Sequence, residues 1–384
     1  MKKIILFVLT TTMCFTTACN GAQATDTYSE VSCSGSETTV ESGTLEEMSE
    51  STDAEQVDLV ADWEYVEWAP GRELKEGDSV QLGCRQFYQG KAYLLEYDVH
   101  TPSCRWFIGE NSLSASLKDA DGSETDLVIY TFCLTDEYMV FSSRLEGDPI
   151  YYGHGDGLRI FVKEQDGNVR QIAESIQDAY VDGGKLVALN MENQVQIYDL
   201  ASGNMEKQVQ PEGMQNMYYM CREYLIYSNA EREVVHYYLD SESTKTVGFS
   251  GIDGKIYSYF VASGNLLGYN NQDRKAILLY EQGEKTSGVL NLPELTECIY
   301  GNWAFCEEGL EVKAYNIATE EYRIIYTIPV ENEEKGIETY IHHYSRDTML
   351  VTEYHSDSHK KYYYEVDLEG NSKFLGEQQM DSDI

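Results

Sequence analysis

The stretch AYVDGGKLVALNMENQVQIYDLASGNMEKQV, residues 179–209, decides the fold. Short apolar segments alternate in it with turn residues, first Gly183-Gly184 and later Ser202-Gly203-Asn204. Glycine and asparagine adopt the positive φ that tight hairpins require. Val, Ile and Leu, which favour strands, fill the intervals. The stretch therefore predicts one antiparallel unit of four short strands.

Two turn markers of this unit recur along the chain at intervals of roughly 40 residues. The turn after the third strand recurs at Asp121, Asp166, Ser202, Glu242, Gly283, Thr319 and Gly370. The turn after the first strand recurs at Gly90-Lys91, Asp136-Glu137, Gly184-Lys185, Arg222-Glu223, Gly264-Asn265, Gly301-Asn302 and Arg346-Asp347. Both series independently predict seven units.

A four-stranded unit cannot bury both of its faces alone, so repeated units must stack against one another. Blades of β-propellers have this strand number and a length of roughly 40–50 residues. A β-sandwich would not repeat one strand order seven times. We predict an all-β fold, a seven-bladed β-propeller of four-stranded antiparallel blades. An irregular all-β domain with ordinary turns is the alternative.

The N-terminus has the features of an export signal. Lys2 and Lys3 precede an apolar run that is too short to span a bilayer. The run ends in FTTAC, which resembles a bacterial lipobox with Cys19 as the lipidated residue, although Thr16 stands where an aliphatic residue is usual. We predict a lipoprotein signal peptide over residues 1–18 and a chain anchored by lipid to the outer face of the bacterial cytoplasmic membrane. Ordinary secretion with cleavage after Ala24 is the alternative.

Residues 19–56 are acidic and rich in Ser and Thr, and they contain no Lys or Arg. Such a segment cannot bury enough apolar surface to fold, so we predict a disordered tether. The propeller is expected over residues 57–384. Its first part, 58–80, could add a strand to the last blade and close the ring, or could cap an edge from outside.

The formal net charge of −38 limits the class of partner. A surface this acidic repels nucleic acid and anionic lipid headgroups. We therefore expect no nucleic-acid partner, contact with the membrane only through the anchor, and a monomeric chain. Asp119, Asp121 and Asp126 have the spacing of the start of a calcium loop, but they lie where the other units have plain turns. We expect no cofactor and no metal, with calcium as the alternative.

The remaining cysteines are scattered and contain no C-x-x-C pair, which argues against a disulfide framework or a zinc site. We expect mostly buried free thiols. Cys298 and Cys306 flank one hairpin, so a disulfide between them is the alternative.

Loop length suggests a binding site. The loops after the second strand of each blade share one face of a propeller. They are long in the first two units (100–111 and 145–157), and the loop HSDSHK of the last unit is the neighbour of unit one once the ring closes. Loops on a rigid scaffold often bind ligands, and aromatic residues are favoured contacts. The candidate ligand-binding residues are Trp106, Phe107, Tyr151, Tyr152, His154 and His355. Packing of these aromatic residues against their own loops is the alternative.

The turns IYDLASGN, FVKEQDGN and YEVDLEGN resemble those of extracytoplasmic bacterial propellers of the TolB-like and quinoprotein-like kind. The resemblance spans roughly residues 77–376 and implies an exported lipoprotein propeller without naming a ligand. The tryptophan docking motifs of quinoproteins are missing, so no cofactor is implied. We expect a non-catalytic module that binds a protein, peptide or glycan. The alternative is a glycan hydrolase or lyase with two or more carboxylates or histidines converging at the central channel.

Overall fold

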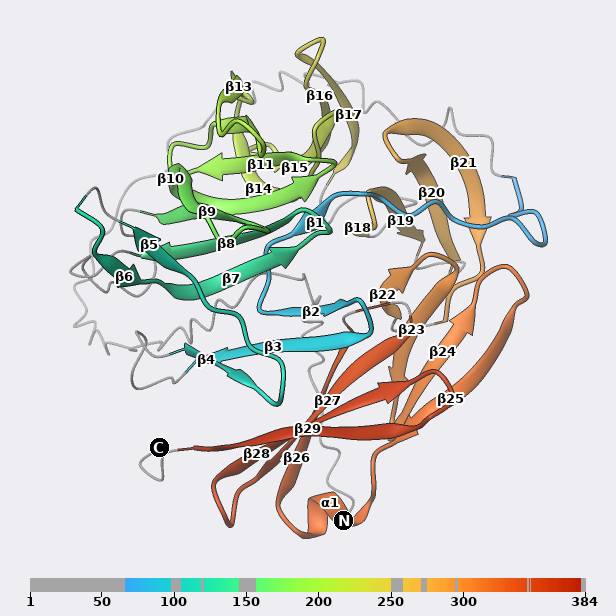
Figure 1. The fold of residues 1–384 in the computed structure, drawn as a ribbon. Coiled ribbons are helices and arrows are strands. Elements are labelled where there is room, and N and C mark those ends of the chain that lie inside the picture. The colour runs from blue at the N-terminus through green and yellow to red at the C-terminus, as the bar shows by residue number, and fades with distance from the viewer. Residues whose placement is uncertain are drawn as a thin grey trace, which may run out of the picture.

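The computed structural model describes residues 66–97, 105–118, 121–144, 157–249, 258–270, 275–293, 296–343, 345 and 347–380. They form antiparallel sheets that make up a ring of seven blades (Figure 1). The predictions of a signal peptide, of lipidation at Cys19 and of a tether fall outside the described residues. None of the helical structure in the described ranges is long and apolar enough to cross a membrane.

The blades are numbered 1 to 7 in chain order. Blade 1 contains β2 (Arg85–Tyr88), β3 (Lys91–Tyr97) and β4 (Arg105–Ile108). Blade 2 contains β7 (Val128–Leu134), β8 (Tyr138–Arg144), β9 (Leu158–Glu164) and the first half of β10 (Val169–Asp182). Blade 3 contains the second half of β10, β11 (Lys185–Asn190), β12 (Val195–Asp199) and β13 (Met205–Val209).

Each of the four remaining blades has four strands in the same order. Blade 4 contains β14 (Met214–Met220), β15 (Tyr224–Asn229), β16 (Glu233–Tyr238) and β17 (Ser243–Phe249). Blade 5 contains β18 (Ser258–Ala262), β19 (Asn265–Asn270), β20 (Lys275–Glu281) and β21 (Glu284–Leu290). Blade 6 contains β22 (Thr296–Tyr300), β23 (Trp303–Glu308), β24 (Glu311–Asn316) and β25 (Glu321–Thr327). The short helix α1 (Glu331–Glu334) precedes blade 7, which contains β26 (Ile337–His343), β27 (Thr348–His355), β28 (Lys360–Asp367) and β29 (Ser372–Gln379).

The stretch 179–209 forms blade 3 as predicted, with Gly183, Gly184 and Gly203 at positive φ in its turns. Its first strand is the end of β10, a 14-residue strand that belongs to two blades. The first half of β10 pairs with β9, and the pairing changes to β11 at Ile176. Blades 2 and 3 are therefore hydrogen-bonded into one continuous sheet.

Apolar packing between neighbouring blades closes the ring. Buried side chains form clusters that join neighbouring blades, one of them spanning blades 3, 4 and 5, and the last cluster joins blade 7 back to blade 1. The first strands β14, β18 and β22 also lie against one another, as do β2 and β7, so the first strand is the inner strand of each blade. The predicted seven-bladed propeller is confirmed.

Blade 1 departs from the repeat. It has three paired strands, because the turn at Asp121, which we expected inside its sheet, joins a separate hairpin of β5 (Ser116–Lys118) and β6 (Glu124–Asp126). The hairpin's Leu117 packs in the apolar cluster between blades 1 and 2. The turn at Asp121 forms as predicted, but a turn signal does not specify which sheet its strands join.

No strand of the N-terminal part pairs with blade 7 in the described residues. Residues 66–84, the crossing segment, instead run over the face that carries the turns after the first strands (the blue trace in Figure 1). Glu67 bridges to Val289 on the outer strand of blade 5, and Leu74 donates its N–H to Asn302 of blade 6. Further on, β1 (Val80–Gln81) pairs with the inner strand of blade 3. The segment thus caps the edge of blade 5 and ties blades 2 to 6 together.

The cysteines in the described ranges are thiols rather than disulfides, as predicted. Four are buried, at positions 84, 133, 221 and 306, and Cys298 is half-buried. Cys298 and Cys306 do not form the alternative disulfide, because Cys298 lies opposite Phe305 and Cys306 lies opposite Thr296.

Candidate functional site

The interface between blades 1 and 7, called the seam below, differs from the other interfaces in its polarity. Its apolar cluster contains four buried residues: Leu94 and Ile108 from blade 1, and Leu350 and Tyr363 from blade 7. Side chains two positions apart on a strand lie on the same face. Glu96, two residues from Leu94, and Lys361, two residues from Tyr363, therefore also face the seam.

Register adds further side chains to the seam. Arg85 lies opposite Leu94, and Trp106 lies opposite Glu96, so both face blade 7. Glu96 is near the end of β3 and Lys361 is near the start of β28. Both therefore lie at the end of the seam where the loops after the second strands emerge. The mouth of the seam is defined here by Glu96, Trp106 and Lys361.

Electrostatics confirm that these groups are close. Burial raises the pKa of Glu96, and the positive charges of Arg85, Lys361 and Arg105 oppose that rise. Burial also raises the pKa of the Tyr363 hydroxyl, which donates a 2.7 Å hydrogen bond to Oε1 of Gln378. A carboxylate thus sits in a poorly hydrated place among cations.

His342 faces the seam from blade 7. Burial, followed by the charges of Arg85 and Lys361, lowers its pKa to about 4, so its ring is neutral at pH 7. His343, the next residue, points to the opposite face, where its ring lies 4.6 Å from that of Phe305 in blade 6. The two rings cannot share a metal, as strand alternation requires.

The predicted ligand-binding residues occupy different environments. Trp106 is on strand β4 rather than in a loop and is 36% exposed at the mouth of the seam. Phe107, on the other face of β4, packs against Phe132 of blade 2 with 5.5 Å between ring centroids. His355 ends β27 and faces away from the seam, with its ring 4.6 Å from that of Tyr362 and Nε2 3.3 Å from Glu353.

The other three predicted ligand-binding residues fall outside the described residues: Tyr151, Tyr152 and His154. Of the three that are described, only Trp106 lies at the seam. Trp106 and Phe107 lie in different environments because successive side chains on β4 point to opposite faces of the sheet. Trp106 therefore faces blade 7, and Phe107 faces blade 2.

A pair of carboxylates lies on blade 6. Glu297 is the extra residue in an irregularity between Thr296 and Cys298 on the inner strand β22. Desolvation, followed by repulsion from Glu307, raises the pKa of Glu297 to about 7. Burial raises the pKa of Glu307 as well. One carboxyl of such a pair is partly protonated near neutral pH, which is the state a general acid requires.

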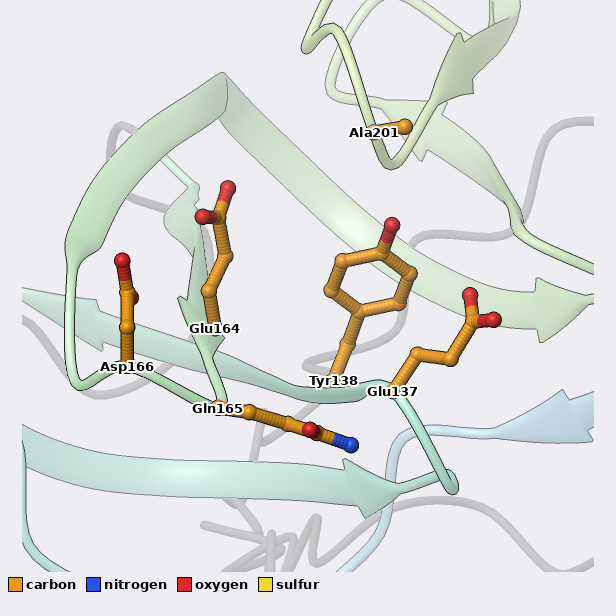
Figure 2. A pocket seen from close by; sticks show the side chains of 6 residues that line it. All are labelled: Glu137, Tyr138, Glu164, Gln165, Asp166 and Ala201. Carbon is orange, nitrogen blue, oxygen red and sulfur yellow. The ribbon is translucent and has the colours of Figure 1, made fainter.

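An open hollow of about 500 Å³ lies between blades 2 and 3, on the opposite face from the seam mouth. Figure 2 shows Tyr138 between the carboxylates of Glu137 and Glu164. Glu164 is already paired with Arg170 (Oε1 to Nε, 3.2 Å), and Arg170 also donates to the carbonyl of Ala201. Glu137 and Asp166 are exposed turn residues, Glu164 is already ion-paired, and the hollow by itself defines no ligand.

Within the described ranges, no three His, Cys, Asp or Glu side chains come together as metal ligands would. Of the aspartates with calcium-loop spacing, Asp121 accepts hydrogen bonds from the N–H and Oγ of Ser123, at 2.9 and 2.7 Å. This is the local bonding of an ordinary turn.

Sequence reasoning missed the charged residues of the seam. Glu96 and Lys361 lie in the aromatic and apolar strands AYLLEY and KKYYYE, and both faces of a propeller strand are covered by neighbours. The available signal for these residues was a charged side chain at a strand position that a neighbouring blade must cover. It could not show which charges meet, because Arg85 and Lys361 are far apart in the chain.

Comparisons with known proteins give little beyond this geometry. No protein-family model and no curated protein matches the chain. Among solved structures, BamB from Moraxella catarrhalis matches with a TM-score of 0.32 and 12% identity, over 80% of this chain and 92% of BamB. The C-terminal WD40 domain of Sif2 matches with a TM-score of 0.37 and 9% identity, over 83% and 91%. Dipeptidyl peptidase 4 of Porphyromonas gingivalis matches with 0.41 and 11%, over 79% and 53%. Likenesses of this size carry no information about activity.

Proposed function

We propose that this chain is a surface-anchored, non-catalytic propeller that binds a protein, peptide or glycan through the long-loop sector of blades 1, 2 and 7. The observation that supports the proposal is the mouth of the seam. There an exposed tryptophan lies beside charged side chains, at the end of the interface where loops emerge. Exposed aromatic side chains next to charged groups are typical of recognition sites.

The anchor is part of this proposal and rests on the sequence. Cys19 would carry the lipid and would hold the protein at the outer face of the cytoplasmic membrane. Metabolic labelling with a radioactive fatty acid tests it, with Cys19→Ser as the control. The proposal of an anchor fails if the wild-type chain and the variant are labelled equally.

A glycan and peptide array tests the binding function. The purified chain is compared with Trp106→Ala, Tyr152→Ala and the control Tyr322→Ala, which removes a 66% exposed aromatic side chain on blade 6. We expect a ligand that binds wild type and Tyr322→Ala but binds Trp106→Ala at least tenfold more weakly. Equal binding by wild type, Trp106→Ala and Tyr152→Ala would place the site elsewhere.

The carboxylate pair on blade 6 supports a second candidate, a glycan hydrolase or lyase. In that case Glu297, with its pKa near 7, would donate or accept the proton. A screen of glycan substrates should then reveal an activity that Glu297→Gln lowers by about 10²–10⁴-fold. Asp166→Asn, an exposed turn substitution, is the control. An activity that survives Glu297→Gln would remove this candidate.

A further inference from the structure

The basic side chains at the seam have no ion-pair partner among the described residues. Neither Arg85 nor Lys361 has a carboxylate oxygen within 4 Å in this part of the chain, although acids outnumber bases 66 to 28 over the whole sequence. The buried Nε of Arg85 also has no hydrogen-bond partner there. A cation that is partly removed from water and has no ion-pair partner within reach is unfavourable, and an incoming anion would relieve that cost.

The charges around the mouth favour an anion of low total charge. Among the described residues, Arg85 and Lys361 both act on the carboxylate of Glu96, and neither forms an ion pair with it. Because the whole chain carries a net charge of −38, a ligand with many negative charges would be repelled before it reached the mouth. This argues for a ligand with a single carboxylate on an otherwise neutral body.

Trp106 supplies a surface for that body. Its ring lies beside Glu96 on the same face and is 36% exposed. A flat indole offers a large apolar contact at small entropic cost, which suits the face of a sugar ring. A guanidinium binds a carboxylate through two parallel hydrogen bonds, and an ammonium adds a point charge.

From this arrangement, we propose that the mouth of the seam binds an acidic sugar residue of the uronic acid class. Arg85 and Lys361 hold its carboxylate, and Trp106 packs against its ring. Glu96 repels the carboxylate and so limits affinity. This inference rests on the proposed binding function and names its ligand class.

Calorimetric titration of the purified chain with glucuronate and with glucose tests it, since the two sugars differ only at C6, where glucuronate has a carboxylate and glucose a hydroxymethyl group. We expect glucuronate to bind at least tenfold more tightly than glucose. Lys361→Gln and Arg85→Ala should each lose about tenfold in glucuronate affinity, whereas Glu96→Gln should gain severalfold. A purely structural role for these charges would not predict opposite signs.

Lys360→Gln is the matched control. Lys360 is the neighbour of Lys361 but faces the other side of the sheet and pairs with Glu377 (Nζ to Oε1, 2.7 Å), so its loss should leave glucuronate affinity unchanged. If Arg85→Ala lowers the melting temperature strongly, Lys361→Gln, at the edge of the seam, carries the test.

Equal binding of glucuronate and glucose, or tighter binding of a glutamyl peptide than of glucuronate, would overturn the inference. Loss of affinity in Lys360→Gln as large as in Lys361→Gln would also overturn it. The binding function would survive if the array finds a neutral ligand that depends on Trp106. Failure of the uronic acid inference can therefore be distinguished from failure of the proposed binding function.

Discussion

The seam and the interfaces around blade 4 both join neighbouring blades, but they differ in the number of buried apolar residues. Around blade 4, one apolar cluster of 24 buried residues joins blades 3, 4 and 5, whereas the seam has four. Each region also contains a histidine whose pKa is lowered to about 4. His236 is fully buried among the rings of Tyr224, Tyr238 and Tyr280, with centroid separations of 4.4 to 4.8 Å. His342 lies near charged side chains instead.

The difference follows from blade 1. A three-stranded sheet offers less apolar area to its neighbour, so more of the blade 7 face is left to polar side chains and to solvent. The crossing segment ties blades 2 to 6 but makes no described contact across the seam. A propeller can thus bury large apolar clusters around most of its ring and keep one interface polar.

Matched core substitutions give the largest expected effect. Leu225 and Leu350 are both buried on second strands, the first in the large cluster and the second in the seam. Leu225→Ala should lower the free energy of unfolding by about 4 kcal/mol, because the surrounding cluster cannot collapse onto the cavity. Leu350→Ala should cost about 2 kcal/mol, since fewer apolar neighbours lose contacts.

Urea denaturation of both variants measures these values, and Val330→Ala, at a 65% exposed position, is the control that should change little. Equal losses for the two leucines would mean that the seam is packed as firmly as the interfaces of blade 4. The comparison would then lose its energetic basis.

Acid should destabilise the region around blade 4 through His236. The folded chain holds this ring neutral because burial, and then the charge of Lys245, lowers its pKa to about 4. The unfolded chain takes up the proton near pH 6.5. Stability is therefore complete above pH 6.5 and falls as pH drops from 6.5 towards 4, by at most about 3 kcal/mol. His236→Phe should remove this part of the pH dependence, as measured by urea denaturation at several pH values.

His342 provides the contrast. Its lowered pKa depends in part on Arg85 and Lys361, so Lys361→Gln should raise the pKa of His342 and leave that of His236 unchanged. Proton NMR titration of the two rings measures both. A variant that moved both rings equally, or neither, would contradict the distinction between a charged and an apolar environment.

The sequence predicted the propeller fold well because the turn residues that indicate this fold act locally. Turn residues such as Gly183 and Gly203 must stand where φ is positive, and seven such turns at a regular interval leave few folds to choose from. The same signals failed at Asp121, whose turn is real although its two strands leave blade 1. Which sheet a hairpin joins depends on contacts between distant residues, which a turn motif does not encode.

The seam was less predictable for a related reason. The sequence predicted Trp106 within a long loop, whereas the residue lies on β4 at the mouth of the seam. Phe107, chosen on the same grounds, packs inwards against Phe132 instead. Only the closed ring, which brings β3 against β28, places Glu96 close to Arg85 and Lys361. Alternation along a strand shows which side chains share a face of the sheet. Only the closed ring shows which neighbouring blade covers that face.

The smallest expected effect tests whether the crossing segment and the seam are independent. Asn302→Ala removes the Oδ1 that accepts a 2.7 Å hydrogen bond from the N–H of Leu74, a buried residue. A buried N–H left without this partner should cost about 1 kcal/mol. Amide hydrogen exchange should then rise in residues 66–84 and in the turn at Asn302, while exchange at Leu94 and Leu350 stays the same.

Asn371→Ala is the control for that experiment, since it removes an exposed turn contact to Asp367 in blade 7 and should cost less than about 0.5 kcal/mol. Faster exchange at Leu94 and Leu350 in Asn302→Ala would show that the segment also holds blades 1 and 7 together from a distance. The polar seam would then owe its closure to the crossing segment. If exchange there is unchanged, the packing of blades 1 and 7 against each other closes the ring without help from the crossing segment.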